Sequence, residues 1–568
     1  MMTDKNMSAP AADGLGRRDF MTAAAAIGLA GMVPASALAA DTAPGQRLIS
    51  ADLGKVKGAM STVWRRCISA GRVGEMRYAV AQDQLRQCKA EIGFEYLRCH
   101  GLFHDELGVY SEDRDGKPVY NFHYVDLVYD FLLSIGVRPF VEFGFMPDAL
   151  ATIPTDKGGK EGTIADPTRK SGKRAVSVFQ WRSNVTPPRD PKRWGDLVSA
   201  ITRHWIERYG RDEVRQWFFE VWNEPNHPAF WSPNDESKRK EEYFELFKLT
   251  SDAVKAVDPT LHVGGPSGAG PVWIPELIAY CVQNKVGIDF ITYHAYGNGR
   301  GATGFDGYGD QLLYLNKDVL TAANFANAGL KDIAASARPD LPVHITEWSA
   351  SYSSRDPVHD DYISAPYILE QLRNTERTAS MSYWIYGDVL EEVGIPPRAF
   401  HGGNGLLTLD GIRKPAFYAY RYLAQMGAEE LANGDGRSWL TRNKDGSVQA
   451  LFWDMTMPNL EEPNQTVFRQ IRPSRPVAPV TLSLAGLKPG RYRLRIEGTG
   501  FERQDAYTAW LKMGAPDYLS FKQAAALKEI AAEKPMRETV VQIGSSGTWS
   551  EQFPMRERDV MLVTLKRG

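Results

Sequence analysis

The chain has 568 residues, 43% of them hydrophobic and 24% charged, so it can bury a large core and wholesale disorder is excluded. Its 67 lysine and arginine residues nearly balance its 69 aspartate and glutamate residues, giving a formal net charge of −2 and no overall attraction to nucleic acid or anionic membranes. At this length more than one domain is expected.

The N-terminal segment, residues 1–40, is typical of an export signal. Two adjacent arginines in GRRDF (16–20) precede the small-residue apolar run MTAAAAIGLAGMVPASALAA (21–40), and ALA (37–39) offers an A-x-A cleavage site. This pattern resembles a bacterial twin-arginine signal, so we expect the twin-arginine export machinery to be a partner and the protein to be periplasmic or secreted. A Sec signal and a membrane anchor are the alternatives. A run rich in Ala and Gly and broken by Pro34 would make a poor permanent span, so no stable membrane insertion is expected after cleavage.

The middle of the chain, residues 59–425, predicts an α/β fold, a (β/α)8 TIM barrel, because short apolar strands alternate with longer helical patterns. The predicted strands are AMSTVW (59–64), FEYLRCHG (94–101), VRPFVEFGFMP (137–147), WFFEVWNEP (217–225), LHVGGPS (261–267), IDFITYHAYG (288–297), LPVHITEWS (341–349) and MSYWIYGD (381–388). The clearest predicted helices are 82–93, 124–136, 194–210, 241–257 and 367–379. The span exceeds a typical barrel and leaves room for long loops, one of them the glycine-rich and charged segment 155–174.

The C-terminal region, residues 426–568, predicts an accessory β-sandwich domain. Residues 447–455, 480–498 and 559–568 alternate apolar and polar side chains around Gly and Pro turns. Residues 41–58, before the barrel, are expected to contribute strands to the same sandwich.

The four cysteines form no CxxC pair, which argues against zinc and redox motifs. Buried free thiols are expected, and one disulfide among the first three cysteines is the alternative.

Two glutamates close predicted barrel strands. Glu224, in VWNEPN (221–226), ends the fourth strand, where Pro225 removes a backbone donor. Glu347, in HITEWSAS (344–351), ends the seventh strand. A barrel brings both strand ends to one rim, and a retaining glycosidase needs two carboxyl groups about 5–5.5 Å apart. Taken singly, Glu224 could be a solvated surface group and Glu347 a structural partner of an arginine; together they favour catalysis.

Neighbouring residues suggest the division of labour. Asn223 can hydrogen-bond a sugar 2-hydroxyl, so the adjacent Glu224 fits the general acid/base. Tyr296, at the end of the sixth strand, can reach Glu347 and hold it ionised as the nucleophile. The alternative from another class is a carbohydrate-binding barrel that has lost turnover, against which the presence of both glutamates argues.

Seven stretches in order resemble glycoside hydrolase family 39, whose barrels carry the acid/base after strand four and the nucleophile after strand seven and whose members typically have a sandwich tail. The stretches are FEYLRCHGLF (94–103), RPFVEFGFMP (138–147), VWNEPN (221–226), ITYHAY (291–296), ITEWSASY (345–352), SYWIYGDVLEEVG (382–394) and FHGGNGLL (400–407).

The resemblance implies further site residues. It suggests that the subsite for the terminal sugar is lined by His100, Phe145, His294 and Tyr296, with aromatic walls from Tyr352 and Trp384. It also matches Glu391 and Glu392 to an acidic pair that grips outer sugar hydroxyls in family β-xylosidases, although two adjacent carboxylates are more often a solvated loop. The chain departs from the family at Tyr386, where Phe is more usual, and in the loop 155–174, which puts the shape of the leaving-group side in doubt.

No metal and no cofactor is expected. His100, His104, His294 and His401 lie in separate segments without HExxH or HxH spacing, so hydrogen bonds to sugar or backbone are the better interpretation. The glycine-rich HVGGPSGAG (262–270) lacks the phosphate-binding patterns and is expected to be a strand end whose backbone packs closely.

The sequence therefore predicts an exported, retaining, exo-acting β-xylosidase that takes an oligosaccharide substrate, with no oligomeric state indicated. Within the family, an α-L-iduronidase-like or arabinopyranosidase-like specificity is the rival. A uronic acid would call for a cation facing its carboxylate, and Arg98, Arg355 or Arg398 lie close enough to site segments to serve.

Overall fold

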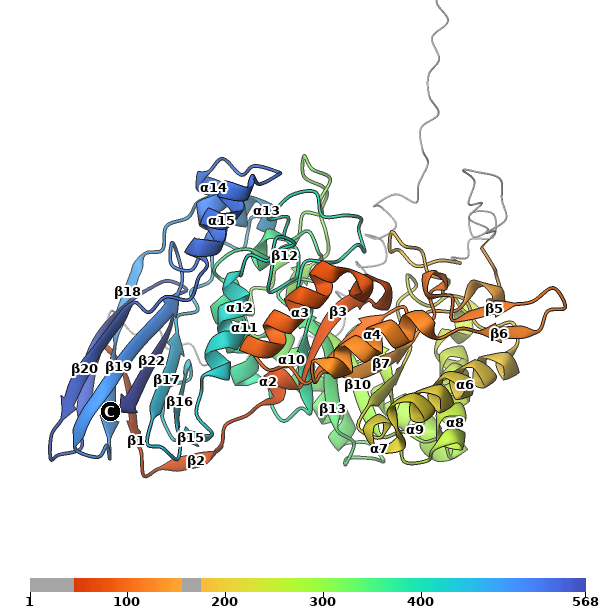
Figure 1. Cartoon of the computed structure of the whole chain (residues 1–568), viewed down its shortest axis with the longest axis horizontal. Helices are drawn as coiled ribbons and strands as arrows, with labels where there is room; N and C mark the ends of the chain where they lie inside the picture. The colour runs from red at the N-terminus through yellow and green to blue at the C-terminus, as the bar shows by residue number, and fades with distance from the viewer. Residues whose placement is uncertain (1–44, 156–174) are drawn as a thin grey trace, which may run out of the picture.

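The computed structural model describes residues 45–155 and 175–568, and its centre is a closed barrel of eight parallel strands (Figure 1). Going round the barrel, the order is β3, β4, β7, β8, β9, β10, β13 and β14, so neighbours in the sheet follow one another along the chain. The predicted export signal and nearly all of the predicted loop 155–174 lie outside the described residues. The barrel confirms the predicted TIM-barrel class.

Seven of the eight predicted strands coincide with barrel strands. The eight observed strands are β3 (Cys67–Arg72), β4 (Tyr96–His100), β7 (Arg138–Phe143), β8 (Phe218–Val221), β9 (His262–Gly268), β10 (Phe290–Tyr296), β13 (Val343–Ser349) and β14 (Ser380–Tyr383).

The first predicted strand, 59–64, is wrong. The chain there leaves strand β2 (Val56–Ala59) and enters the short helix α2 (Val63–Arg66), and the first barrel strand is β3. All six residues of β3 (CISAGR) are buried, yet most are small or polar. A strand that lines the inside of a barrel with small side chains has weak apolar patterning, which explains the misassignment.

A helix follows each barrel strand and covers the outside of the sheet (Figure 1). These helices are α3 (Ala79–Glu91), α4 (His123–Ser134), α6 (Pro191–Tyr209), α8 (Arg239–Val257), α9 (Ile274–Asn284), α10 (Thr321–Ala334), α11 (Ser364–Asn374) and α12 (Pro415–Ala424). Smaller elements in the connections are η2 (Val73–Arg77), η3 (Asp105–Leu107), η4 (Asp148–Leu150), α7 (Arg211–Val214), η5 (Glu236–Lys238), η6 (Pro357–His359) and the hairpins β5 (Tyr110–Glu112) with β6 (Pro118–Tyr120) and β11 (Asn298–Arg300) with β12 (Tyr314–Leu315).

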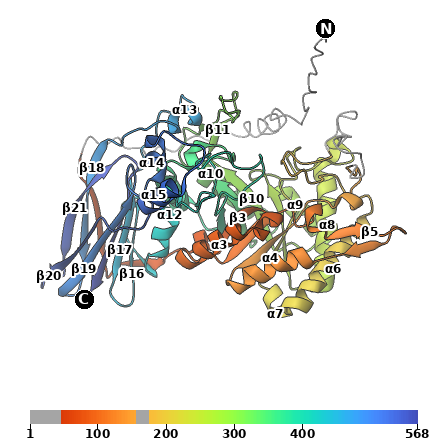
Figure 2. The ribbon, with the colours of Figure 1, turned by 45° about the horizontal axis from the view of Figure 1, so that its top comes forward.

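Two sheets form the sandwich beside the barrel, on the side opposite the β5–β6 hairpin in both ribbon views (Figures 1 and 2). The larger sheet runs β2, β15 (Glu429–Leu431), β16 (Ser438–Arg442), β17 (Val448–Trp453), β22 (Val560–Arg567), β19 (Gly490–Thr499) and β20 (Arg537–Ile543). The smaller sheet runs β1 (Arg47–Asp52), β18 (Pro476–Ala485) and β21 (Trp549–Arg556). Both N-terminal strands, β1 and β2, therefore join the sandwich, as the sequence indicates for residues 41–58.

Period-two alternation lets one sheet pack on both of its faces. In β17, Ala450 and Phe452 join the core between the two sheets, whereas Leu451 and Trp453 join the hydrophobic core of the barrel. The indole Nε1 of Trp453 donates to Glu370 of α11 at 2.7 Å. The outer face of the larger sheet therefore fastens the sandwich to the barrel by contributing side chains to the barrel core.

The sandwich also reaches the loop that follows β14. The segment between β19 and β20 carries α14 (Ala506–Lys512) and α15 (Phe521–Ile530), which lie at one end of the sandwich near α13 (Asn464–Phe468) in Figure 1. Their apolar side chains, Tyr507 and Trp510 among them, pack on Phe400. The insertion thus braces a barrel loop that carries predicted site residues.

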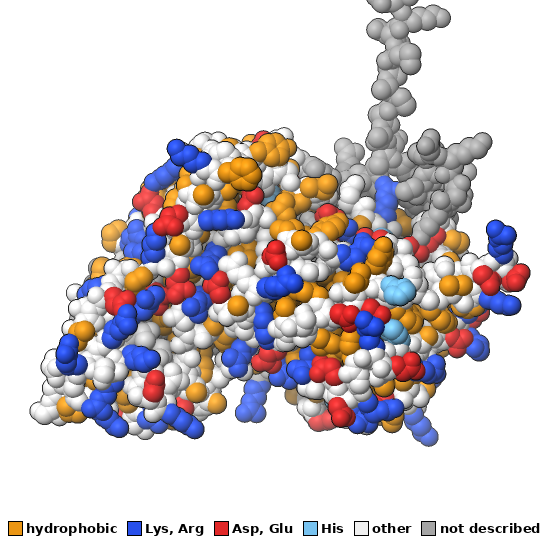
Figure 3. All heavy atoms as spheres, in the orientation of Figure 1, with side chains coloured by type: hydrophobic (Ala, Val, Ile, Leu, Met, Phe, Trp, Pro, Cys, Tyr) orange, Lys and Arg blue, Asp and Glu red, His pale blue; other side chains and the backbone are white. Residues whose placement is uncertain are grey.

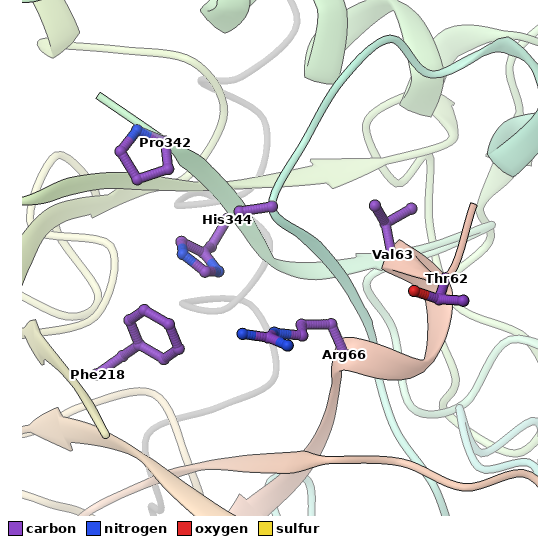
Figure 4. Close-up of a pocket in the computed structure, with 7 residues that line it drawn as sticks. Thr62, Val63, Arg66, Phe218, Pro342 and His344 are labelled. Carbon is purple, nitrogen blue, oxygen red and sulfur yellow. The ribbon is translucent and has the colours of Figure 1, made fainter. Parts of the chain in front are cut away.

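A cavity of about 280 Å³ opens where several barrel strands begin, and Arg66, Phe218 and His344 point into it (Figure 4). Burial lowers the pKa of His344 to about 3, so this imidazole is neutral at ordinary pH. The predicted site residues lie at the other ends of the strands. Within the part of the chain that the structure describes, no helix combines the length and apolarity that a membrane crossing needs.

Candidate active site

Glu224 and Glu347 meet at the carboxyl ends of the barrel strands. Glu224 follows β8, Glu347 lies in β13, and a carboxylate oxygen of each comes within 4.8 Å of the other. His294 of β10 sits between them, its Nδ1 2.8 Å from Glu224 and 3.5 Å from Glu347. This separation fits the roughly 5–5.5 Å of retaining glycosidases and is shorter than the roughly 6.5–9.5 Å of inverting ones.

The backbone around Glu224 is strained. Trp222, Glu224 and Ser267 have φ angles of 71°, 44° and 54°, a region that non-glycine residues rarely occupy and that costs on the order of 1–3 kcal/mol each. Hydrogen bonds hold the turn: the amide of Glu224 donates to the carbonyl of Ser267 at 2.8 Å, and that of Trp222 to Phe143 at 3.1 Å. The surrounding barrel therefore fixes the direction of the Glu224 side chain.

The surroundings of Glu224 favour its protonated form. Burial raises the pKa of its carboxyl group, against the opposing influence of His227, His100 and Arg98. The Nδ1 atom of His294 lies 2.8 Å from its Oε1. Glu224 therefore has the raised pKa that a general acid requires.

The surroundings of Glu347 favour an anion. Its Oε1 accepts a hydrogen bond from Nη1 of Arg98 at 2.8 Å, and its Oε2 accepts one from the hydroxyl of Tyr296 at 2.6 Å. Burial raises the pKa of Tyr296 well above its usual range, so this phenol keeps its proton and remains a donor. The two glutamates thus occupy environments suited to opposite protonation states.

Arg98, in β4, is the central cation of the site and has no exposed surface. Its Nε donates to Glu220, and its Nη2 donates to Asn223 at 3.0 Å and to Ser267 at 3.1 Å. With the bond to Glu347, these contacts join four barrel strands or their ends. The bond to Oδ1 of Asn223 leaves the Nδ2 group of Asn223 to donate to a sugar hydroxyl.

The two predicted site histidines are neutral donors or acceptors. Burial lowers the pKa of both His100 and His294 to about 4. His100 lies between Glu142, 2.7 Å from Nδ1, and Glu347, 3.3 Å from Nε2. Both rings therefore belong to the site, as the family resemblance implies.

Of the predicted aromatic residues, Trp384 and Phe145 are buried and Tyr352 is partly exposed. The ring of Trp384 lies 4.9 Å from that of His100, and Tyr352 packs edge-on to Tyr296 at 6.4 Å. Phe145 has no exposed surface and packs 6.3 Å from His100 and 6.0 Å from Trp181, so it supports the site instead of presenting an exposed face to a sugar. The hydroxyl of Tyr386 donates to the carbonyl of Ala81 and takes no part.

The structure separates Glu391 from Glu392. Glu391 accepts from Nη2 of Arg72 at 2.7 Å, and its amide donates to Glu75 at 2.9 Å, so it anchors the loop after β14. Glu392 is buried, its Oε1 has no hydrogen-bond partner among the described residues, and this atom lies 3.9 Å from His100. Burial raises the pKa of Glu392 well above its usual range. Of the predicted acidic pair, only Glu392 is directed at the site.

Alanine substitutions are expected to separate the two roles. Glu392→Ala should lower kcat/KM by roughly 10–100-fold, mainly through KM, because removing this carboxyl group would leave a buried sugar hydroxyl without a partner, which costs about 1–3 kcal/mol. Glu391→Ala should lower the melting temperature instead, since it removes a partner of the buried Arg72, and should change kcat/KM much less. Steady-state kinetics and thermal unfolding of both variants test this; equal kinetic losses would contradict the separation.

Three residues of the site could in principle hold a metal ion. Glu224, His294 and Glu347 are the group among the described residues whose ligand atoms come close enough to hold an ion. The guanidinium of Arg98, 2.8 Å from Glu347, already supplies a positive charge there and would repel a second cation. His104 and His401 contact backbone carbonyls, of Trp181 and Arg398.

Several residues of the site were not predicted from sequence motifs. Glu142 of β7 and Glu220 of β8 are fully buried beside Arg98, and Arg72 and Glu75 hold the loop of Glu391. The available signal was a charged residue inside an apolar strand, in FVEF (140–143) and FFEV (218–221). Such a residue must find a buried partner, which in a barrel lies on a neighbouring strand.

Comparisons with known proteins agree with this geometry. The sequence profile described as "Glycosyl hydrolases family 39" matches residues 47–550. A β-xylosidase of Geobacillus stearothermophilus is 36% identical over 512 residues, 89% of this chain and 92% of the relative. A β-xylosidase of Caldicellulosiruptor saccharolyticus is 32% identical over 92% of this chain and 98% of the relative. The crystal structure of the GH39 enzyme from Xanthomonas axonopodis pv. citri superposes with a TM-score of 0.84, at 37% identity, covering 92% of this chain and 98% of that one.

Proposed function

The chain belongs to glycoside hydrolase family 39, and from this membership we propose that it is a retaining exo-β-xylosidase that removes terminal xylose from xylo-oligosaccharides. The observation that carries the mechanism is the carboxylate pair, Glu224 and Glu347, within 4.8 Å of each other with opposite surroundings. The proposed sugar rests on the two β-xylosidases that the chain matches over most of its length.

Double displacement assigns one role to each carboxyl group. Glu347 attacks the anomeric carbon while Glu224 gives its proton to the departing oxygen, which leaves a xylosyl ester on Glu347. Glu224, now ionised, takes a proton from a water molecule that attacks the same carbon from the face that the leaving group vacated. The ester bond breaks, Glu347 is released and the configuration of the sugar is retained. Asn223 would donate to the 2-hydroxyl, a bond that strengthens as positive charge develops on the ring.

A panel of nitrophenyl glycosides tests the sugar, with NMR reading the anomer that forms first. Highest kcat/KM on the β-D-xyloside and β-xylose as the first product are expected. Preference for a uronide or an α-L-arabinopyranoside would reject xylose, and an α-anomer as first product would reject retention.

The three arginines that could face a uronic acid carboxylate each have other partners among the described residues. Arg98 is enclosed by Glu220 and Glu347, and Nη2 of Arg355 donates to the backbone carbonyls of Gly394 and Ile395. Arg398 stacks on the ring of Tyr308 at 3.8 Å. These contacts occupy the three arginines that were candidates to bind a uronic acid carboxylate, which supports a neutral sugar as the substrate.

Export through the twin-arginine machinery to the periplasm or the cell exterior is part of the proposal. It is supported by the arginine pair before a weakly hydrophobic run in residues 16–40, which lie outside the described residues.

Replacing Arg17 and Arg18 by lysine is expected to abolish export, because the twin-arginine receptor reads the arginine pair itself. Cell fractionation should find the variant in the cytoplasm and the parent chain in the periplasm or medium. The same fractionation in cells that lack the twin-arginine translocase, and in cells whose Sec pathway is inhibited, separates the two routes. Export that stops only on Sec inhibition would refute the proposal.

A further inference from the structure

Three carboxylates crowd one cation beneath the proposed nucleophile. Glu142, Glu220 and Glu347 each lie within 2.8 Å of Arg98, and all four side chains are buried. A single guanidinium cannot balance three negative charges in a site with little water. At least one of these carboxyl groups is therefore expected to keep its proton.

Hydrogen bonds distinguish Glu142 from the other two. Glu220 accepts on both oxygens, from Thr346 at 2.9 Å and from Nε of Arg98, and Glu347 also accepts on both. Oε1 of Glu142 has no hydrogen-bond partner among the described residues, and its Oε2 lies 2.8 Å from Nη2 of Arg98, whose bonds go to Asn223 and Ser267. A buried anion with one bare oxygen is unfavourable, so Glu142 is the group suited to remain neutral.

His100 places a further demand on Glu142. Nδ1 of His100 lies 2.7 Å from Oε2 of Glu142, a distance that requires a proton between them, and Nε2 lies 3.3 Å from Oε1 of Glu347. A neutral imidazole has one N–H. If that proton were on Nδ1, the lone pair of Nε2 would face the Glu347 carboxylate, and the two would repel.

We infer that Glu142 is a positioning residue: it enters the reaction un-ionised, shares its proton with Nδ1 of His100, and so keeps the Nε2–H of His100 directed at the nucleophile Glu347. The Glu142–His100 pair then holds two protons, one between the residues and one facing Glu347. The inference rests on the proposed function, because it takes Glu347 as the nucleophile.

The charges around the pair agree with this assignment. Burial raises the pKa of Glu142 to about 8, with Arg98 opposing and Glu220 adding to the rise, and burial lowers that of His100 to about 4. The groups that face the pair are Arg98, Glu220, Glu224, His294, Glu347, Glu392 and the amide of Gly101. Most of the titratable groups among them are carboxyls, so the surroundings resist loss of a further proton. Above about pH 8 the pair is expected to lose one proton and its donor to Glu347.

The test removes the acid/base first, since burial raises the pKa of Glu224 and its own ionisation would add to the pH profile. In a Glu224→Ala background, kcat/KM on the dinitrophenyl form of whichever glycoside the protein cleaves best reports attack by Glu347 alone. Between about pH 5 and about pH 10 this parameter should fall at least about ten-fold through an inflection near pH 8. Adding Glu142→Gln should abolish the inflection, because a glutamine amide donates to Nδ1 at every pH. The same inflection in both proteins, or none in either, would overturn the inference.

Variants with Glu224 intact supply the control at neutral pH. Glu142→Gln should keep more than about a tenth of kcat/KM, whereas Glu142→Ala should lose roughly 100-fold, a loss typical of a lost donor at a reacting charge. Glu220→Gln is the matched control. Glu220 contacts the same Arg98, but it accepts hydrogen bonds on both oxygens, so this substitution should lower kcat/KM far more than Glu142→Gln does. Equal losses for the two glutamines would show that Glu142 acts as an anion. A failure of the proposed function is distinguishable, because Glu347→Ala would then stay active.

Discussion

Glu347→Ala is expected to lower kcat by roughly 10⁴–10⁶-fold, the loss typical when a covalent nucleophile is removed. Without this side chain no ester forms, and water would have to attack the sugar directly. The barrel should survive, because Arg98 keeps its contacts with Glu220 and Asn223. Turnover of an aryl β-xyloside, with thermal unfolding measured beside it, checks both statements.

Added azide makes the assignment of Glu347 sharper. In the space vacated by the carboxylate, azide can attack the anomeric carbon once, and a single displacement converts a β-xyloside into an α-xylosyl azide. Glu207→Ala, at an exposed position of α6, is the surface control and should leave kcat unchanged. Full activity of Glu347→Ala, or a β-xylosyl azide as its product, would reject Glu347 as the nucleophile.

The catalytic rim could be predicted because it follows from chain topology. Glu224 and Glu347 are 123 positions apart in sequence, yet each comes at the end of an apolar segment of strand-like composition. Once eight alternating strands and helices are recognised, parallel strands must bring their carboxyl ends to one edge. No side-chain detail is needed for that step, and the observed meeting of the two glutamates agrees with it.

The network beneath the rim could not be predicted in the same way. Which carboxylate pairs with Arg98 depends on the register between neighbouring strands: Arg98 pairs with Phe140 of β7, and Glu142 pairs with Glu220 of β8. A shift of one residue would turn each side chain to the other face of the sheet. The weak periodicity of β3 has the same origin, since small inward residues are selected by packing inside the barrel and leave little trace in hydrophobic patterning.

Local contacts also decide the fate of the acidic pair. Glu391 and Glu392 are adjacent and of the same type, so the sequence does not distinguish their roles. The structure does, because Arg72, 319 residues earlier in the chain, binds Glu391 away from the site. The resemblance to family β-xylosidases assigns both to sugar binding. In the structure only Glu392 is directed at the site, whereas Glu391 fixes the loop that carries both residues.

Glu224→Ala is expected to produce a loss that depends on the leaving group. For xylobiose, whose leaving oxygen needs a proton, kcat/KM should fall by about 10²–10⁴-fold. For a dinitrophenyl xyloside, which departs without protonation, kcat/KM should change by less than about ten-fold, while kcat and KM fall together because the xylosyl ester on Glu347 waits for an unassisted water molecule. Steady-state kinetics on a series of aryl xylosides of graded leaving-group pKa, with a pre-steady-state burst on the most reactive one, measures this dependence.

Azide also tests the assignment of Glu224, because its product with Glu224→Ala should have the opposite anomeric configuration from its product with Glu347→Ala. Azide needs no general base, so in Glu224→Ala it should attack the ester on Glu347 and restore kcat on the dinitrophenyl xyloside. Two displacements then give a β-xylosyl azide, where Glu347→Ala gives the α form. An equal loss on every substrate, or rescue with an α product, would contradict the assignment. The two azide products distinguish the roles because each product depends on which carboxylate remains. The raised pKa of Glu224 suits it to donate a proton, and the hydrogen bonds that Glu347 accepts on both oxygens suit it to act as the ionised nucleophile.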